Sequence, residues 1–263
     1  MRNLVTSAAV LAGLLVTTGA LAQEAQGQAN VGMSLPGATP AAARAGTSDH
    51  DQMVGRLAVG YFGVTQVGAG AGVGDDPGDS AYSVVGDAPV IGVRYWLNQT
   101  IGIDVGVGIG IMGGKDTLEG DPDVEADKPS FTGFNLHGGV PLALASAGHF
   151  TFEIVPELNV GIGSAGEDPN GDADGETSYS GFHLDVGARA GAEIHFGFIN
   201  IPQLALQGSV GLALAIDSGK TTVTPPMAGP DVVQKSSKTT FTTTVQGEPW
   251  DIFTGNIAAL YYF

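Results

Sequence analysis

Hydrophobic and polar residues alternate along most of the chain after residue 53. The clearest example is "TIGIDVGVGIGIMGG", in which apolar residues occupy every second position from Ile101 to Ile111. Glycine or aspartate fills the positions between them. A period of two that is sustained in this way predicts a β-strand with one apolar face. A helix is excluded, because glycine at every second position is costly and apolar side chains would surround the helix.

Seven further segments show the same period, and the chain is therefore predicted to be all-β. The eight predicted strands cover residues 54–66, 88–97, 100–113, 130–143, 149–163, 179–196, 199–216 and 249–263. Most are longer than the roughly 5–6 residues of a typical globular strand, and a tilted strand crosses a bilayer in about 9–11 residues. No segment after the N-terminal region is apolar for the roughly 20 residues of a membrane-spanning helix. A membrane location therefore requires a closed barrel, in which every backbone group is paired.

The connections between these strands alternate in length. The short ones are "NQ" after Leu97, "ASAG" and "GF", whereas the long ones cover residues 67–87, 114–129, 164–178 and 217–248. Strict alternation places every long loop at the same end of the sheet. Short periplasmic turns and long outer loops are typical of bacterial outer-membrane barrels. The predicted fold is thus an eight-stranded antiparallel transmembrane β-barrel with both termini at the periplasmic end.

Aromatic residues gather near the strand ends. Beside the short turns or the C-terminus lie Tyr95, Phe150, Phe152, Phe196, Tyr261 and Phe263; beside the long loops lie Phe131, Phe134, Tyr179, Phe182 and Phe253. Two aromatic bands that flank an aliphatic middle are typical of the interfacial girdles of membrane barrels. The alternative is that aromatic residues simply favour strands.

The last strand, which ends in "AALYYF", resembles the final strand of the outer-membrane barrel family. Its members commonly end in a phenylalanine that follows alternating apolar positions, here Ile257, Ala259, Tyr261 and Phe263. The resemblance implies that the barrel-assembly machinery reads these residues during insertion and that outer-membrane lipid surrounds the barrel. It covers residues 54–263 and is greatest to the small OmpA/OmpX/OmpW-type barrels.

The first 53 residues differ in character from the rest. Arg2 is followed by an apolar run and by Ala20-Leu21-Ala22, the pattern of a secretory signal peptide that is cleaved near Ala22. A transmembrane anchor is the alternative, but the run is short and interrupted by threonine. Residues 23–53 are rich in Ala, Gly, Gln and Pro, and they are predicted to form a flexible periplasmic extension.

Charged residues define two candidate sites. A lumen charge network is predicted from the inward-facing residues Arg56, Arg94, Asp104, Glu153, Glu157, Asp185, Arg189 and Glu193. Eight strands leave an interior just wide enough for side chains, and buried charges must be paired. The lumen is therefore expected to be largely closed. The alternative is a narrow water-filled conduit, because several inward positions are glycine.

The acidic outer loops contain the second candidate site. In "DPNGDADGE" the oxygen-bearing residues Asp168, Asn170, Asp172, Asp174 and Glu176 alternate, as they do at the start of Ca²⁺ loops. No acidic residue follows at the twelfth position counted from Asn170, so a solvated acidic surface is the alternative. Apart from this Ca²⁺, no cofactor is predicted.

Composition narrows the function further. The net charge of −17 argues against a nucleic-acid partner, which requires a basic surface. The five histidines do not suggest a catalytic cluster, and the chain is predicted to be non-enzymatic. A structural or surface-interaction role in the bacterial outer membrane is expected, with an unknown extracellular ligand. A porin-like channel for small solutes and a secreted soluble β-sandwich are the alternatives.

Pro141 and Pro156 conflict with the predicted strands, because each lacks the backbone N–H that would donate to the neighbouring strand.

Overall fold

The computed structural model describes residues 48–72, 80–118, 120, 124–167, 176–225, 229–243 and 257–263. A short helix α2 (Asp49–Met53) precedes the sheet. The strands are β1 (Leu57–Ala69), β2 (Val84–Trp96), β3 (Gly102–Leu118), β4 (Val124–Gly139), β5 (Leu142–Ala147), β6 (Phe150–Glu167), β7 (Glu176–Phe196), β8 (Ile201–Thr224), β9 (Val232–Thr243) and β10 (Ile257–Tyr262), with a 3₁₀ turn η2 (Gly197–Ile199) between β7 and β8. None of the helices in the described part of the chain is long and apolar enough to cross a membrane.

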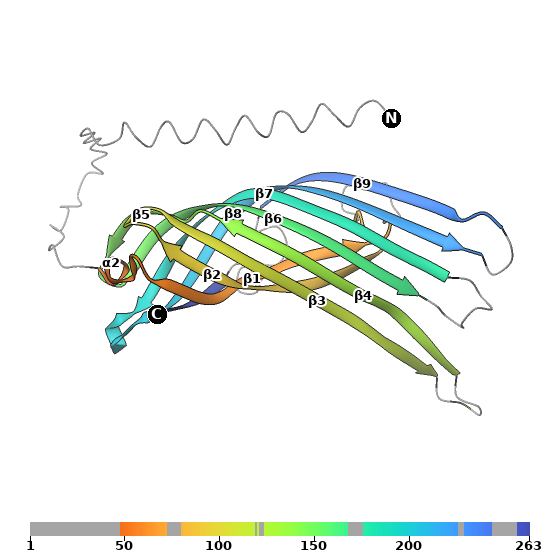
Figure 1. The fold of residues 1–263 in the computed structure, drawn as a ribbon, viewed down its shortest axis with the longest axis horizontal. Helices are drawn as coiled ribbons and strands as arrows, with labels where there is room; N and C mark the ends of the chain where they lie inside the picture. The colour runs from red at the N-terminus through yellow and green to blue at the C-terminus, as the bar shows by residue number, and fades with distance from the viewer. Residues whose placement is uncertain are drawn as a thin grey trace, which may run out of the picture. The chain divides into compact units, whose positions relative to one another are not determined.

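One antiparallel sheet closes on itself. Strand β10 pairs with β1 on one side and with β8 on the other, so that β10, β1, β2, β3, β4, β6, β7 and β8 form a ring (Figure 1). This ring confirms the predicted eight-stranded antiparallel barrel. The soluble β-sandwich is wrong, because a single closed sheet has no second sheet to pack against.

The predicted alternation of faces is present along the ring. On β3, Ile103, Val105 and Val107 are exposed, whereas Asp104 is 1% exposed and points inward. A strand places successive side chains on opposite faces, and a barrel turns one of these faces into an interior. The interior of this barrel therefore contains the polar residues and its outside the aliphatic ones.

Both prolines lie where the sheet can accommodate them. Pro141 falls in the break between β4 and β5, so the predicted strand over 130–143 is interrupted there. Pro156 lies within β6 opposite this break, where its carbonyl oxygen accepts a hydrogen bond from Val140 N. The N–H and C=O of one strand residue point to the same side. The nitrogen of Pro156 therefore faces Val140 in this break, where the regular ladder is already interrupted.

Two predicted long loops are largely wrong, because the strands continue through them. Strand β8 extends to Thr224 and pairs with β9, which occupies most of the predicted loop over 217–248. Likewise, β3 and β4 together leave only residues 119–123 of the predicted loop over 114–129. These extensions carry polar residues and threonine on both faces, so hydrophobic alternation gave no signal. Their β-branched residues nevertheless favour strands.

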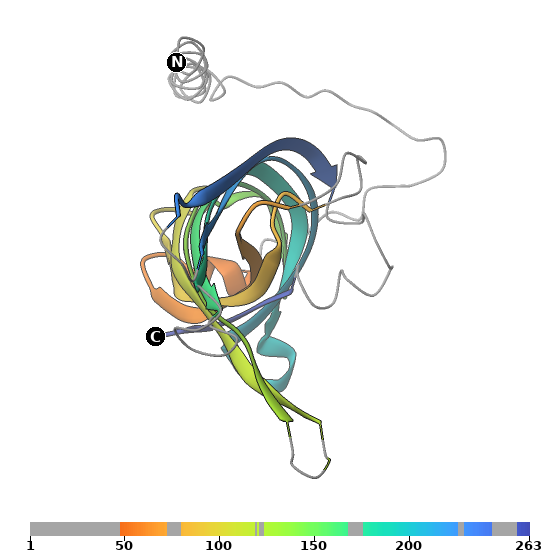
Figure 2. The same ribbon diagram turned by 90° about the vertical axis from the view of Figure 1, so that its right-hand side faces the viewer.

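The outer half of the β1–β2 hairpin folds into the barrel interior (Figure 2). Strand β1 bends at a bulge between Tyr61 and Val64, where Gly63 adopts a φ of 104° that favours glycine. Beyond the bend, a side chain at Gly163 or Gly181 would collide with the carbonyl oxygen of Gly68. The ring is therefore filled by its own first hairpin at this level.

This folded-in hairpin corrects the outer aromatic band. Phe131 was expected at the lipid interface, but it is 1% exposed and packs inside against Val67, Ala88 and Ala165. Tyr179 is half-buried against the same cluster. Phe134 and Phe182 do face outward. Phe131 and Phe134 are separated by an odd number of positions, so one strand cannot present both to lipid.

Candidate functional site

The short-turn end of the barrel is covered by α2, although residues 48–53 were predicted to belong to a flexible extension. Ser48 and Asp51 form a capping box: Ser48 Oγ accepts from Asp51 N, and the Asp51 carboxylate accepts from Ser48 N. His50 packs edge-on against Trp96 with ring centroids 4.5 Å apart, and its Nε2 lies 3.0 Å from Gln99 O. Burial lowers the pKa of His50. The helix is therefore held by apolar packing and capping together.

Above α2, Arg94 is fully buried and contacts three carboxylates. Its Nε and Nη2 donate to the two oxygens of Asp104 at 2.8 and 2.7 Å. Its Nη1 donates to Glu153 at 3.3 Å and also to Glu193. Gln207 Oε1 accepts from Nη2 at 2.9 Å. These contacts join β2, β3, β6, β7 and β8, and we refer to Arg94, Asp104, Glu153, Glu193 and Gln207 as the Arg94 cluster.

Aromatic residues enclose the Arg94 cluster. The guanidinium lies 5.9 Å from the ring centroid of Phe62 and 5.8 Å from that of Trp96, within cation–π range. Tyr262 is 0% exposed, and its hydroxyl donates to Glu193 at 2.9 Å while accepting from Trp96 Nε1 at 3.0 Å. Aromatic packing and hydrogen bonds thus exclude water from this level of the interior.

A second polar network lies nearer the folded-in hairpin. Arg189 Nε donates to Glu157 at 2.7 Å. A separate chain of contacts runs from His137 through Asn159, Asp185, His183 and Asp217 to Tyr82, with heavy-atom distances between 2.7 and 3.3 Å. Burial and the neighbouring Asp217 raise the pKa of Tyr82, so its hydroxyl stays a neutral donor. This chain ties β4, β6, β7 and β8 to the β1–β2 connection.

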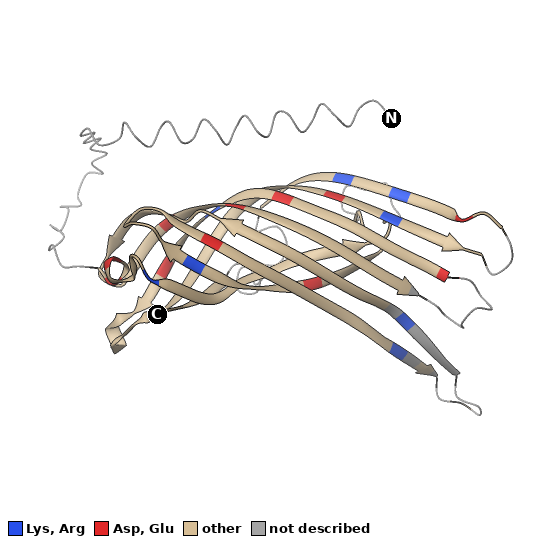
Figure 3. Cartoon of the chain, in the orientation of Figure 1, with Lys and Arg blue, Asp and Glu red and all other residues tan. Residues whose placement is uncertain are grey.

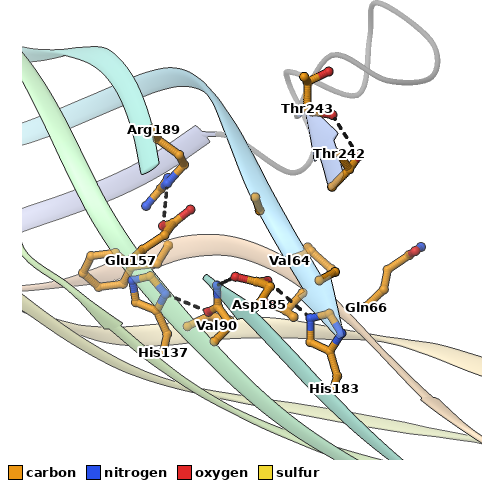
Figure 4. A pocket seen from close by; sticks show the side chains of 15 residues that line it. Val64, Gln66, Val90, His137, Glu157, His183, Asp185, Arg189, Thr242 and Thr243 are labelled. Atoms are coloured by element: carbon orange, nitrogen blue, oxygen red, sulfur yellow. Dashed lines mark hydrogen bonds and ion pairs between the residues drawn. The ribbon is translucent and has the colours of Figure 1, made fainter. Parts of the chain in front are cut away.

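A cavity of about 250 Å³ opens between these groups (Figure 4). Its polar lining comes from Thr65, Gln66, His137, Glu157, Asn159, His183, Asp185, Arg189, Thr242 and Thr243, and its apolar lining from Phe62, Val64, Val90, Ala213 and Ala215. Seven strands contribute to it. The cavity is therefore a product of barrel closure rather than of any one segment.

His183 is not arranged to activate a nucleophile. Both ring nitrogens of His183 face carboxylates, Asp185 at 3.3 Å and Asp217 at 2.7 Å. Carboxylates only accept, so both nitrogens act as donors and neither serves as a base. The described residues also contain no group of three or more His, Cys, Asp or Glu side chains that could hold a metal ion.

The structure places most of the predicted network inside the barrel, but in separate groups. Asp104, Glu153 and Glu193 surround Arg94, whereas Glu157 pairs with Arg189 and Asp185 contacts His183. Arg56 is wrongly included: it precedes β1 and is exposed at the barrel end. Strand alternation starts only at Leu57, so the position of Arg56 does not follow the inward parity.

The other predicted sites fall partly outside the described residues. The Ca²⁺ ligands Asp168, Asn170, Asp172 and Asp174 lie outside them, and Glu176 is the exposed first residue of β7. In the final strand, Tyr261 and Phe263 point outward and are 45% and 68% exposed, while Ile257 and Ala259 are half-buried. Recognition of these four residues by the barrel-assembly machinery stays a prediction.

Sequence reasoning missed Asp217 and Tyr82, because both were assigned to loops. Asp217 continues the inward parity of β8 beyond the predicted strand end, so a longer strand would have included it. Tyr82 lies in the β1–β2 connection and enters the interior only because the hairpin folds inward. No local signal marks it.

Comparisons with known proteins find one structural likeness. The chain matches no family model and no curated protein. It is similar to the solved structure of Ail, the attachment invasion locus protein of Yersinia pestis, with 15% sequence identity, coverage of 80% of this chain and 100% of that chain, and a TM-score of 0.38. The ring of hydrogen-bonded strands makes this chain an eight-stranded antiparallel β-barrel, and its interior contains charged, hydrogen-bonded side chains.

Proposed function

We propose that this protein is a bacterial outer-membrane β-barrel with a structural or surface-interaction role and a closed lumen. The observation that carries the proposal is its inverted distribution of residues. Arg94, Glu153 and Glu193 are 0% exposed, whereas Ile91 is 61% and Ile111 80% exposed. A protein in water buries its aliphatic side chains and exposes its charges. An outward aliphatic band around a barrel is the arrangement that a lipid bilayer stabilises.

The positions of the charged residues also support a membrane location, and they suggest which end of the barrel faces outside the cell. The lysines Lys115, Lys128, Lys220, Lys235 and Lys238 all lie on the strand ends farthest from α2 (Figure 3). Between these ends and the short turns, the outward face is aliphatic. Charges on a lipid-facing surface are costly near the middle of the bilayer and much less so at its edges. The lysine-bearing ends would then lie outside the cell and α2 in the periplasm, after removal of residues 1–22.

Three layers would close the lumen to ions. Helix α2 covers one end, the Arg94 cluster crosses the interior above it, and the folded-in β1–β2 hairpin fills the opposite half. Each buried charge of the Arg94 cluster is held by an opposite charge, so opening a water path would break several ion pairs together.

Surface interaction would use the parts of β3, β4, β8 and β9 that extend beyond the ring. Residues 114–118 of β3 pair only with residues 124–128 of β4 among the described strands. Residues 212–223 of β8 pair with all of β9. These hairpins carry the lysines and would project from the cell as rigid, hydrogen-bonded arms.

Fractionation combined with heat-modifiability tests the membrane assignment. The full chain should appear in the outer-membrane fraction, and its band on SDS gels should shift between unheated and boiled samples. Trypsin added to intact cells should cleave at the lysines of the extended hairpins. A band in the soluble fraction that does not shift would refute the assignment.

Planar-bilayer recording separates the closed barrel from the small-solute channel. We expect no stable single-channel conductance for the purified barrel. The cavity beside Arg189 is the observation that favours a channel, because it leaves space within the lumen. A reproducible small conductance would replace the closed-lumen proposal with the porin-like one.

A further inference from the structure

Strands β3 and β9 each present one edge with which no described strand pairs. Strand β2 pairs with β3 as far as Gly108 and then turns into the lumen with β1, so beyond Gly108 β3 pairs with β4 alone. Strand β9 pairs with β8 along its length, and its other edge meets no described strand. Among the described strands, the outer wall of the barrel is therefore open between β3 and β9.

The uncovered edge of β3 lies among apolar side chains. Ile109 and Ile111 point outward and are 57% and 80% exposed, and residues 109–114 carry no charge. Lipid cannot bind unpaired backbone groups, so an open sheet edge inside a bilayer is covered by protein. Edge strands that stay unpaired usually carry charges, often lysine, that prevent pairing. This part of β3 lacks such protection, and it is suited to receive another strand.

The edge of β9 changes character along its length. Lys235 and Lys238 lie in its outer part, whereas residues 239–243 carry no charge. Phe241 is 64% exposed and pairs with Leu214, which faces outward from β8. The part of β9 nearest the ring is therefore as uncharged as the edge of β3, and it carries an outward aromatic side chain.

The tilt of the strands sets which residues share a height in the barrel. Tilted strands make the register drift along the strands as it is followed around the ring. From Val59 the register reaches Leu204 of β8 through Tyr261, and it reaches Leu214 the other way, through Val93, Val105, Gly138, Leu158 and Val186. Leu204 and Leu214 are ten positions apart. The register therefore drifts toward the outer end by slightly more than one residue at each strand.

The same drift relates β3 to β9. From Ile111 the register leads through Thr132, Ser164, Ser180 and Lys220 to Lys235. These five steps carry the register about six residues toward the outer end. The residue of β9 at the height of Ile111 is therefore six positions nearer the ring than Lys235, and this residue is Phe241.

Side chains of the two edges match in this register. Ile111 and Phe241 both face outward, and opposed aromatic and β-branched residues stabilise a strand pair. A shift by one residue would oppose an outward side chain to an inward one. A shift by two residues would place Lys115 opposite Lys235 in one direction, and Gly113 opposite Phe241 in the other. Parity, height and charge thus select the same alignment.

Chain direction allows the edges of two copies to meet. Strand β3 runs toward the outer end and β9 runs back from it. Rotation about the membrane normal preserves both directions, so β3 of one copy is antiparallel to β9 of a neighbour in the same membrane. Within one chain, the positions that β1 and β2 vacate separate the two edges by three strand spacings, about 14 Å. A neighbouring copy can therefore supply a strand that the chain itself does not.

We propose that copies of this chain associate side by side in the membrane, with β9 of one copy added to the uncovered edge of β3 of the next and Phe241 opposite Ile111. This inference rests on the membrane assignment proposed above, and it adds a second copy of the chain as a partner. Because the two surfaces differ, closed pairs and longer rows of copies contain the same contact.

Disulfide cross-linking tests the contact, because the chain contains no cysteine. Ile111→Cys and Phe241→Cys are produced together in one cell, and isolated outer membranes are oxidised and analysed on boiled, non-reducing SDS gels. Directly opposed strand residues place their Cβ atoms near the separation that a disulfide requires. We expect a band at twice the chain mass that disappears on reduction, and at most one tenth as much of it when either variant is produced alone.

Ile103→Cys with Phe241→Cys is the matched control. Ile103 also faces outward from β3, but it lies within the closed ring and pairs with Tyr95 of β2. We expect this combination to give at most one tenth of the cross-linked band. If either test variant does not fold, Ile109→Cys with Thr243→Cys replaces the pair, because these residues are opposed in the same alignment.

Three results would overturn the proposal. The first is cross-linking no greater than that of the control combination. The second is equally strong cross-linking by Ile111→Cys alone, and the third is a disulfide within single chains that carry both substitutions. The heat-induced gel shift of each variant is measured in parallel. A normal shift without the cross-link refutes the association and leaves the membrane-barrel proposal intact, whereas a soluble band without a shift refutes both.

Discussion

Replacing Arg94 with methionine removes the only guanidinium of the Arg94 cluster while keeping most of its aliphatic stem. The side chain is 0% exposed and makes hydrogen bonds to Asp104, Glu153, Glu193 and Gln207. Breaking a buried ion pair by removing one partner typically costs about 3–5 kcal/mol. Here three carboxylates lose the same partner at once. We therefore expect Arg94→Met to lower the free energy of unfolding by at least about 3 kcal/mol, roughly a hundredfold in the equilibrium constant.

Urea unfolding in lipid vesicles measures this loss, with the fraction folded read from the heat-dependent gel shift and from tryptophan fluorescence. Arg56→Met is the matched control, because Arg56 is exposed and lies outside the Arg94 cluster. Its effect should remain within about 0.5 kcal/mol, as for most surface substitutions. The comparison separates loss of the ion pairs from a general effect of losing one positive charge.

A compensating variant tests the electrostatic reasoning itself. Combining Arg94→Met with Asp104→Asn, Glu153→Gln and Glu193→Gln removes the uncompensated negative charges along with the guanidinium. Replacing a complete buried ion-pair group by neutral side chains is often far less costly than breaking it. We expect the combined variant to recover most of the lost stability. If Arg94→Met unfolds at the same urea concentration as the unaltered protein, the Arg94 cluster does not hold the barrel closed.

Other perturbations have equally definite outcomes. Tyr262→Phe should lower stability by about 1–3 kcal/mol in the same urea assay, because it removes the hydrogen bond to Glu193 and leaves the buried Trp96 Nε1 without its acceptor. Gly163→Val should raise the ion conductance in planar bilayers, because its side chain would displace Gly68 and the folded-in hairpin. Burial lowers the pKa of His50, so docking of α2 should be complete above about pH 6.5 and weaken as the pH falls below it. Fluorescence of the adjacent Trp96 should report this change, and His50→Gln should abolish it.

Local alternation was enough to predict the ring strands and their inner and outer faces. Ile103, Val105, Val107 and Ile109 face outward. Asp104 faces inward, because successive side chains of a strand always take opposite sides. The same parity indicated that Arg94, Glu153 and Glu193 share an interior. This parity did not predict the structure where the hydrophobic alternation is absent. Strand β9 is polar on both faces, and Arg56 precedes the first residue to which the parity applies.

Contacts between distant segments decided the rest. The alternation shows that Arg94 and Glu193 both point inward, but only barrel closure brings β2 and β7 to the same level of the lumen. Gly63 looks like an ordinary strand glycine in the sequence, yet its bend turns a hairpin inward, buries Phe131 and bounds the cavity. Strand periodicity is set by each residue's own backbone, and it is therefore readable along the chain. Register, closure and close packing depend on residues far apart in sequence, so only the tertiary structure determines them.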